Sequence, residues 1–322
     1  MKLRGIEFGS VFGASGVQGF FGEGYRHHQI LRLFGLSLRG VTFVAKTVTT
    51  KKRKGKMPLK NDGITPKEWF PRCVKVYFRQ GAMLNAVGLS NPGITALLDT
   101  GQWQKRDRPF LLSFAPVEPT PKDRIAEVRQ FKCQLLSRLP TLQTQVGLQI
   151  DCSCPNVDIE KDPNLLANEV KNWLAILSAL KIPLMPKFSV LTPVQVAKKI
   201  ADDPNCDAIC VSNAIHWDDL DKVGIDCEEL FSTNISPLAE FGGGGLSGKP
   251  LFPLVVDWLI RSRRIGTGKP ILVGGGVSCS DDVNAIHYFG GSAIFIGSVV
   301  NLRWWRTRKI VARAHQLFSQ CD

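Results

Sequence analysis

The chain of 322 residues is long enough to bury a large core, and one α/β barrel or two ordinary domains would fit this length. Hydrophobic residues make up 44% of the sequence and charged residues 21%, which is typical of a soluble globular protein and excludes a disordered or fibrous chain. No apolar run approaches the ~20 residues needed to cross a bilayer. The N-terminus also lacks the long apolar segment of a secretory signal, so we expect a cytoplasmic protein.

The formal net charge of +13 raises the question of an anionic partner. The densest basic run, residues 51–56, has no interleaved aromatic residues, which argues for a solvated loop and against nucleic acid. Nine cysteines, an odd number, favour free thiols over a disulfide framework. Cys152 and Cys154 would point the same way on a strand, but no second pair of ligands has suitable spacing, so we expect no metal site.

Short apolar, β-branched runs alternate with amphipathic helical patterns along the chain, which is typical of a parallel α/β fold. In chain order, the predicted strands are 41–47, 83–89, 110–116, 146–153, 182–190, 207–214, 270–276 and 293–300. The predicted helices are 123–139, 164–181, 194–203, 251–262 and a closing helix, 301–320.

Eight strands with intervening helices predict a (β/α)8 TIM barrel in a single domain over 1–322. A doubly wound sheet is the alternative, but it predicts a glycine-rich fingerprint after the first strand, and the glycines here cluster late. Residues 51–82 form a long insertion after the first predicted strand, which we interpret as a lid, an interface element or decoration.

Polar residues stand at the C-terminal ends of the predicted strands, where barrel enzymes carry their catalytic groups. Two lysines, two amides and a carboxylate at one face are costly to bury without partners, so they indicate a pocket for a planar, anionic ligand. These residues are Lys46, Asn85, Asp151, Lys187 and Asn213.

The late glycines indicate part of that ligand. Loops after strands seven and eight of a barrel often bind phosphate through backbone N–H groups, and 273–282 runs directly into a predicted helix whose N-terminus would face the anion. Segment 295–300 would supply the second half, and the loop 241–248 would let more backbone approach. The pattern favours a phosphate-tailed cofactor such as FMN, although such glycines can also serve only to make tight turns.

At this point the sequence resembles the dihydroorotate dehydrogenase family, and the resemblance runs nearly end to end. The matching motifs, in the family's order, are ASG (14–16), AKTVT (45–49), MLNAVGLSNPG (83–93), CSCPN (152–156), PKF (186–188), SNA (212–214), GGLSG (244–248), GGG (274–276) and IGS (296–298). Cysteine at 154 is similar to the soluble class 1 branch, since the membrane-associated, quinone-using branch has serine there. The residues of the NAVGLSNPG and GGLSG motifs are most similar to the soluble form that works with an iron–sulfur flavoprotein partner. The resemblance also implies a homodimer.

The resemblance implies a role for each matching residue. In this family dihydroorotate loses a proton from C5 and a hydride from C6, and the hydride goes to the flavin. Cys154 would be the base, Lys46 would lie near the substrate carboxylate and the flavin edge, and Lys187 would stabilise the reduced flavin. The substrate-binding set it implies is Lys46, Asn85, Val87, Gly88, Leu89, Asn156, Asn213 and Ala214. The FMN-binding set it implies is Ala14, Ser15, Lys46, Thr47, Asp151, Lys187, Asn213, Gly244, Gly245, Gly275, Gly276, Gly297 and Ser298.

Two departures from the family pattern keep other readings open. Asp151 stands where the family usually has asparagine, and a carboxylate only accepts hydrogen bonds. Ala214 stands where serine or threonine is common. The alternatives are a related FMN enzyme acting on another pyrimidine or small planar substrate, a tRNA dihydrouridine synthase, and a flavin-binding subunit with weak catalysis.

Overall fold

The computed structural model describes residues 1–153 and 163–319, and its main sheet is a curled sheet of seven parallel strands. The strand order is β3-β13-β12-β9-β8-β7-β6, and isolated parallel bridges join segment 42–48 to β3 on one side and to β6 on the other. That segment therefore occupies the eighth position of a closed ring, and the predicted TIM barrel is confirmed. The strands are β3 (Val11–Gly13), β6 (Phe110–Phe114), β7 (Val146–Asp151), β8 (Leu184–Phe188), β9 (Ile209–Val211), β12 (Ile271–Val273) and β13 (Ala293–Ile296).

One barrel strand was missed and one predicted strand is wrong. The first barrel strand is β3, a three-residue strand that the sequence analysis did not find. The predicted barrel strand 83–89 is wrong, because only Ala82–Asn85 is extended and this strand (β5) pairs antiparallel outside the barrel. A strand's composition does not reveal whether its partner is parallel or antiparallel, which is why the two were confused.

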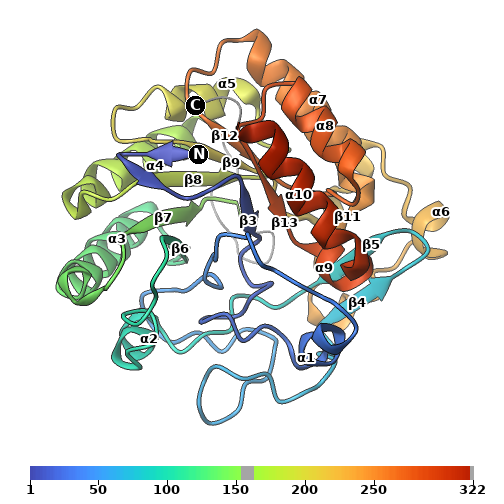
Figure 1. Ribbon diagram of the computed structural model, residues 1–322, viewed down its shortest axis with the longest axis horizontal. Helices are drawn as coiled ribbons and strands as arrows, with labels where there is room; N and C mark the ends of the chain where they lie inside the picture. Colours follow the sequence, from blue (N-terminus) through green and yellow to red (C-terminus); the bar gives the residue numbers. More distant parts are fainter. Residues whose placement is uncertain (154–162, 320–322) are drawn as a thin grey trace.

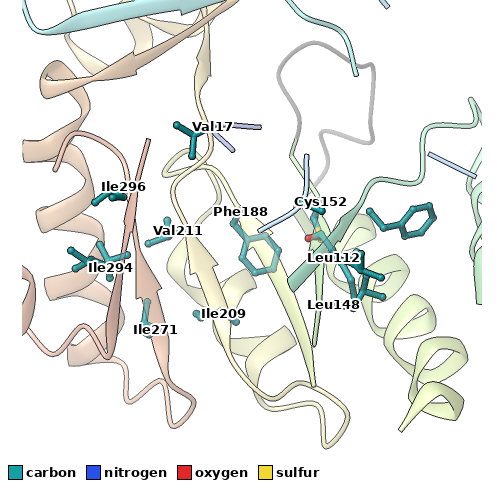
Figure 2. Close-up of a cluster of buried hydrophobic side chains, with 14 of the residues drawn as sticks. Val17, Leu112, Leu148, Cys152, Phe188, Ile209, Val211, Ile271, Ile294 and Ile296 are labelled. Carbon is teal, nitrogen blue, oxygen red and sulfur yellow. Dashed lines mark hydrogen bonds between the residues drawn. The ribbon is translucent and has the colours of Figure 1, made fainter. Parts of the chain in front are cut away.

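Side chains of the barrel strands alternate between two buried layers, as the period of a strand requires. In β6, Phe110, Leu112 and Phe114 pack outward against the helices, whereas Leu111 points into the barrel. Figure 2 shows the outer layer, where alternate residues of β6, β7, β8, β9, β12 and β13 meet in one cluster. Both faces are mainly apolar up to the C-terminal ends of the strands, so most of each strand reads as a hydrophobic run.

A hairpin at the N-terminus fills the bottom of the barrel. Strands β1 (Lys2–Leu3) and β2 (Ile6–Glu7) pair antiparallel and present Leu3 and Ile6 to the barrel interior, followed by Phe8. The interior is so full that a Cβ on Gly147 of β7 would lie 2.8 Å from Leu111 and 3.2 Å from the Phe8 ring. Polar chemistry is therefore confined to the opposite, C-terminal end of the strands.

Helices surround the barrel (Figure 1), and α2, α3, α4, α5, α7, α8 and α10 pack each against the next. Their starts follow local signals: the Thr120 hydroxyl accepts from Asp123 N at the start of α3, and Pro121 opens the first turn. The helices are α1 (Arg26–Leu33), α2 (Ile94–Asp99), α3 (Pro121–Leu136), α4 (Pro163–Leu177), α5 (Val194–Ala201), α6 (Cys227–Phe231), α7 (Phe252–Arg264), α8 (Ser280–Tyr288), α9 (Ser298–Leu302) and α10 (Thr307–Phe318). No described helix is long and apolar enough to cross a membrane.

The closing helix, predicted as one element over 301–320, is interrupted. Arg303 leaves the helical region at φ −144° and separates α9 from a short 3-10 turn and α10. Its guanidinium donates to the Phe78 carbonyl at 2.8 Å, a contact with a distant segment that the local helical pattern does not encode.

A second, antiparallel sheet covers the C-terminal end of the barrel. Its order is β10 (Ile215–His216), β11 (Gly245–Gly248), β5 and β4 (Val74–Tyr77). The long insertion 51–82 thus supplies β4 and the first residue of β5, and it builds part of a roof over the strand ends.

Candidate active site

A cavity of about 560 Å³ lies between the strand ends of the barrel and the roof sheet. The barrel forms its floor, which includes Lys46, Asp151 and Lys187, and the roof sheet contributes Met83 and Asn85 of β5. Aromatic side chains of the insertion line the outer part. This volume is within the ~300–1,000 Å³ of small-molecule sites.

Most residues predicted for the site line this one cavity. The barrel floor contributes Ala14, Ser15, Lys46, Thr47, Asp151, Lys187, Asn213 and Ala214. The roof and the segment after β5 contribute Asn85, Val87, Gly88 and Leu89, and the two late glycine loops contribute Gly275, Gly276, Gly297 and Ser298.

Four predicted residues are not part of the described cavity. Cys154 and Asn156 lie outside the described residues. Gly244 and Gly245 are described, but they do not line the cavity; Gly245 is the first residue of strand β11 and Gly244 precedes it. Gly244 packs against β5, where a Cβ would lie 3.0 Å from the Asn85 carbonyl oxygen; Ser247 and Gly248 of the same strand reach the cavity instead.

Lys46 is a buried cation on the cavity floor, with 8% of its surface exposed. Its ammonium donates to the Ser90 carbonyl at 2.6 Å and lies 4.8 Å from the centre of the Phe20 ring. Burial lowers the pKa of Lys46 to about 8, and the nearby Cys73 and Glu23 only partly oppose this shift. An ammonium has three donors and the described residues accept only one, so Lys46 is suited to bind an anion.

Three consecutive backbone N–H groups next to Lys46 have no acceptor among the described residues. They belong to Val87, Gly88 and Leu89, and the last two have φ of 63° and 57°. The carbonyls of this segment are already used: Lys56 N donates to Val87 O, the Arg53 side chain to Gly88 O and the Asn91 side chain to Leu89 O. A run of unused N–H groups in this conformation is a typical carboxylate or phosphate site.

Asp151 forms the centre of a second polar cluster. Its Oδ1 accepts from the Asn213 side-chain nitrogen at 2.6 Å, and its Oδ2 lies 3.6 Å from the Lys187 ammonium. The charge that the sequence analysis singled out is therefore paired within the cavity floor, and Lys187 compensates it.

A line of hydroxyl groups crosses the top interior layer of the barrel. Ser15 Oγ lies 2.7 Å from Thr47 Oγ1, which lies 2.8 Å from Ser113 Oγ, and Ser113 donates to Gln149 Oε1 at 3.3 Å. Each hydroxyl has one hydrogen, so Ser113, which donates to Gln149, accepts from Thr47, and the single Ser15 hydrogen is shared between Thr47 Oγ1 and the Ala45 carbonyl at 3.1 Å. This line satisfies the buried polar groups beneath the cavity.

Two histidines of α1 form a part of the site that the sequence analysis missed. The Tyr25 N–H donates to His28 Nδ1, so His28 must carry its proton on Nε2 and donate it to Asn301 Oδ1 at 2.8 Å. The same oxygen must then accept from His27 Nε2, also at 2.8 Å, which leaves His27 Nδ1 buried with no partner among the described residues. Because His27 and Asn301 line the cavity, this nitrogen is suited to accept from a ligand donor. The only sequence signal was the Tyr25-Arg-His-His28 run itself.

The glycine loop after β12 approaches the roof closely. Gly276 has φ of 96°, and a Cβ there would lie 2.7 Å from the Gly248 carbonyl oxygen. The N–H groups of Gly275 and Gly276 have no acceptor among the described residues. Just before α8, Asp282 Oδ2 accepts from the N–H groups of Ser278 and Cys279, so these two N–H groups are already used.

Comparison with known proteins agrees with this geometry. The family model described as dihydroorotate dehydrogenase matches residues 1–315. The catalytic subunit of dihydroorotate dehydrogenase B (NAD(+)) from Streptococcus pneumoniae is 28% identical over 308 residues, covering 92% of this chain and 85% of that protein. Dihydroorotate dehydrogenase A (fumarate) from Lactiplantibacillus plantarum is 29% identical, covering 76% of this chain and 75% of that protein.

The fold has a solved counterpart as well. The crystal structure of the Eimeria tenella dihydroorotate dehydrogenase in complex with ferulenol matches with a TM-score of 0.67, covering 99% of this chain and 84% of that one. Its sequence identity of 15% speaks for the fold alone. A family match over nearly the whole chain, together with a barrel whose strand ends hold the matching residues, leads to one conclusion: the chain belongs to the dihydroorotate dehydrogenase family.

Proposed function

We propose that the chain is an FMN-dependent dehydrogenase that oxidises (S)-dihydroorotate to orotate in pyrimidine biosynthesis. The cavity supports this most directly, because it joins the buried cation Lys46 and the free N–H groups of 87–89 to the two glycine loops. Membership of the family supports the reaction class, the oxidation of a CH–CH group.

The residues present fit FMN. Backbone N–H groups of Gly275, Gly276, Gly297 and Ser298 would hold the phosphate, with Ala14, Ser15 and Thr47 beside the ring system. The unpartnered His27 Nδ1 suits a hydroxyl of the cofactor's chain. FMN, when bound, supplies a hydride acceptor. Lys187 would place positive charge near it.

The substrate would lie over the same floor. The N–H groups of Val87, Gly88 and Leu89, with the Lys46 ammonium, would receive its carboxylate. Asn85, Asn156 and Asn213 would bind the polar ring edges. Cys154 would remove the proton from C5, for which its thiolate must be favoured by nearby positive charge.

An anaerobic experiment tests the proposal. The purified protein should carry one FMN per chain, and dihydroorotate should bleach its visible absorbance. Cys154→Ala should bind orotate but slow this bleaching by about 10²–10⁴-fold, the usual contribution of a general base. Cys152→Ala is the matched control, because the Cys152 thiol is buried in the cluster between strands and helices. A yellow protein that never bleaches would point to the flavin-binding subunit instead.

The relatives also support a partner subunit and a homodimer. A relative named a catalytic subunit of an NAD(+) enzyme supports an iron–sulfur flavoprotein subunit as partner, and the family resemblance supports a homodimer and a cytoplasmic location. Size-exclusion chromatography with light scattering, with and without such a subunit, tests both assemblies.

A second candidate function is favoured by one observation. Asp151 places a carboxyl group, where the family usually has an amide, on the cavity floor, and its Oδ1 accepts from Asn213. This arrangement favours a related FMN oxidoreductase acting on another pyrimidine or small planar substrate. Bleaching by a different dihydropyrimidine, faster than by dihydroorotate, would support it.

A further inference from the structure

Three side chains at the ends of neighbouring strands set the polarity of one side of the cavity floor. Asp151 and Lys187 are direct partners in the β7–β8 register, and Asn213 follows β9, where its N–H donates to Phe188 O at 2.9 Å. All three line the cavity, and Asp151 is only 3% exposed. Their positions are therefore fixed by the barrel.

The carboxylate determines how the neighbouring amide is oriented. A carboxylate only accepts hydrogen bonds, so the side-chain nitrogen of Asn213 must face Asp151, at 2.6 Å. The second amide hydrogen is directed to Ser153 Oγ at 3.4 Å. Both amide hydrogens are thus used, and no described residue donates to Asn213 Oδ1.

The Lys187 ammonium lies on the other side of the carboxylate, 3.6 Å from Asp151 Oδ2. The carboxylate thus has a donor on each side, the Asn213 amide at Oδ1 and the Lys187 ammonium near Oδ2.

We infer that Asp151 and Asn213 Oδ1 form a hydrogen-bond-accepting edge that selects a ligand presenting N–H donors. The inference rests on the proposed function and narrows its substrate class to dihydropyrimidine acids in which an amino group, in place of one ring carbonyl oxygen, faces the ends of β7 and β9. A carbonyl oxygen at that edge would face two acceptors with no hydrogen between them and would remain without a donor there, which costs about 10- to 100-fold in affinity.

The variant Asp151→Asn would not have this selectivity. A primary amide both donates and accepts, so two facing amides, one from the new side chain and one from Asn213, can turn to suit either a carbonyl or an amino group. The single negative charge is what fixes the polarity of the edge.

The test compares isosteric ligands on the flavin-loaded protein. Orotate is titrated beside its two isosteres, in which an amino group replaces one or the other ring carbonyl oxygen, and dissociation constants come from calorimetry. The wild-type chain should bind one amino isostere more tightly than orotate. Asp151→Asn should reduce that preference at least tenfold in ratio.

Asp207→Asn is the matched control, because Asp207 stands at the opposite end of the same strands, where it accepts from Leu184 N at 2.8 Å. It should leave the preference unchanged. Tighter binding of orotate than of both isosteres by the wild-type chain would overturn the inference even where Asp151→Asn does not fold.

The outcomes separate this inference from the proposed function. If orotate binds and dihydroorotate bleaches the flavin, but Asp151→Asn leaves the ligand ratio unchanged, only the accepting edge is wrong. If no pyrimidine acid binds and nothing bleaches, the proposed function fails and the inference fails with it.

Discussion

Lys46 shows how one residue combines a structural and a binding role. Its ammonium ties the barrel floor to the roof segment through the Ser90 carbonyl, and its remaining donors face the cavity. Burial disfavours the charged form of Lys46 and lowers its pKa to about 8, so the side chain can lose its proton slightly above neutral pH.

This position predicts a pH dependence of ligand binding. Because burial lowers the pKa of Lys46 to about 8, the side chain carries its positive charge below that pH and loses it above that pH. The affinity of the flavin-loaded protein for the orotate anion should therefore fall as pH rises through about 8, approaching tenfold per pH unit. Calorimetric titrations between pH 6.5 and 9 measure it. Lys46→Met should bind weakly with a flat profile, and equal affinity of the wild type across that range would contradict the prediction.

Helix α1 depends on a histidine held in its neutral form. His28 is 1% exposed, and its two nitrogens join Tyr25 N to Asn301 of α9. Burial lowers the pKa of His28 to about 4, and the hydrogen bond to Asn301 only partly opposes it. The side chain thus links two elements at the cavity edge only while it is uncharged.

Acid should therefore weaken the fold at α1. The pKa of His28 is lower in the folded than in the unfolded chain, where it is about 6.5, so its contribution is complete above that value and is lost as pH falls toward about 4. The loss is about 3 kcal/mol. Urea unfolding of the wild type and of His28→Gln measures it, since glutamine does not titrate. A stability difference between the two that stays constant from pH 7 to pH 4 would show that His28 is not the titrating group.

Helices α3 and α4 are joined by a buried ion pair. Arg124 donates to Glu169 through two nitrogens at 2.7 and 2.9 Å and to the carbonyls of Glu118 and Pro119. Removing one partner leaves a buried charge without a counterion.

Arg124→Met should accordingly lower the free energy of unfolding by about 3–5 kcal/mol. The double variant Arg124→Met, Glu169→Leu should recover much of that loss, because it removes both charges. The exposed pair Arg138–Asp99, at 2.6 Å, is the comparison, and Arg138→Ala should cost at most about 1 kcal/mol. Denaturant titration measures the loss in the free energy of unfolding for each variant. Equal losses for Arg124→Met and Arg138→Ala would mean that burial does not determine how much an ion pair contributes to stability.

At the scale of the whole molecule, the cavity lies between the barrel and the antiparallel sheet and is lined by residues of both. The barrel provides the floor and the antiparallel sheet provides the roof, and their residues come from segments far apart in the chain (Figure 1). A ligand that contacts both should stabilise the entire fold, since it binds only when floor and roof are assembled.

Adding FMN to protein stripped of flavin should therefore raise the melting temperature. At a concentration of about 100 times Kd the gain is about 2.7 kcal/mol, or about 4 °C for a chain of this size. Riboflavin, which lacks the phosphate, should give less than half of this shift. Equal shifts for the two ligands, followed by circular dichroism, would show that the loops at 274–276 and 297–298 do not bind the phosphate.

The sequence predicted the parts of the molecule that depend on local pattern. Strands β6 to β9, β12 and β13 were found because both of their faces are apolar, and Lys46, Asp151, Lys187 and Asn213 were found because polar residues end those runs. Strand β3 was missed because three residues are too few to show a period. The roles of His27, Asn301 and the β11 glycines depend on contacts between distant segments, which no local pattern records.

The hydroxyl line from Ser15 to Gln149 limits how this barrel can evolve. Thr47 donates to Ser113 and Ser113 donates to Gln149, so replacing Ser113 by an apolar residue would leave Thr47 without this acceptor and Gln149 without this donor. Such a change is tolerated only together with changes at the neighbouring positions. Positions 15, 47, 113 and 149 should therefore be inherited as a unit, and lineages that lost one of these polar groups should have replaced its neighbours as well.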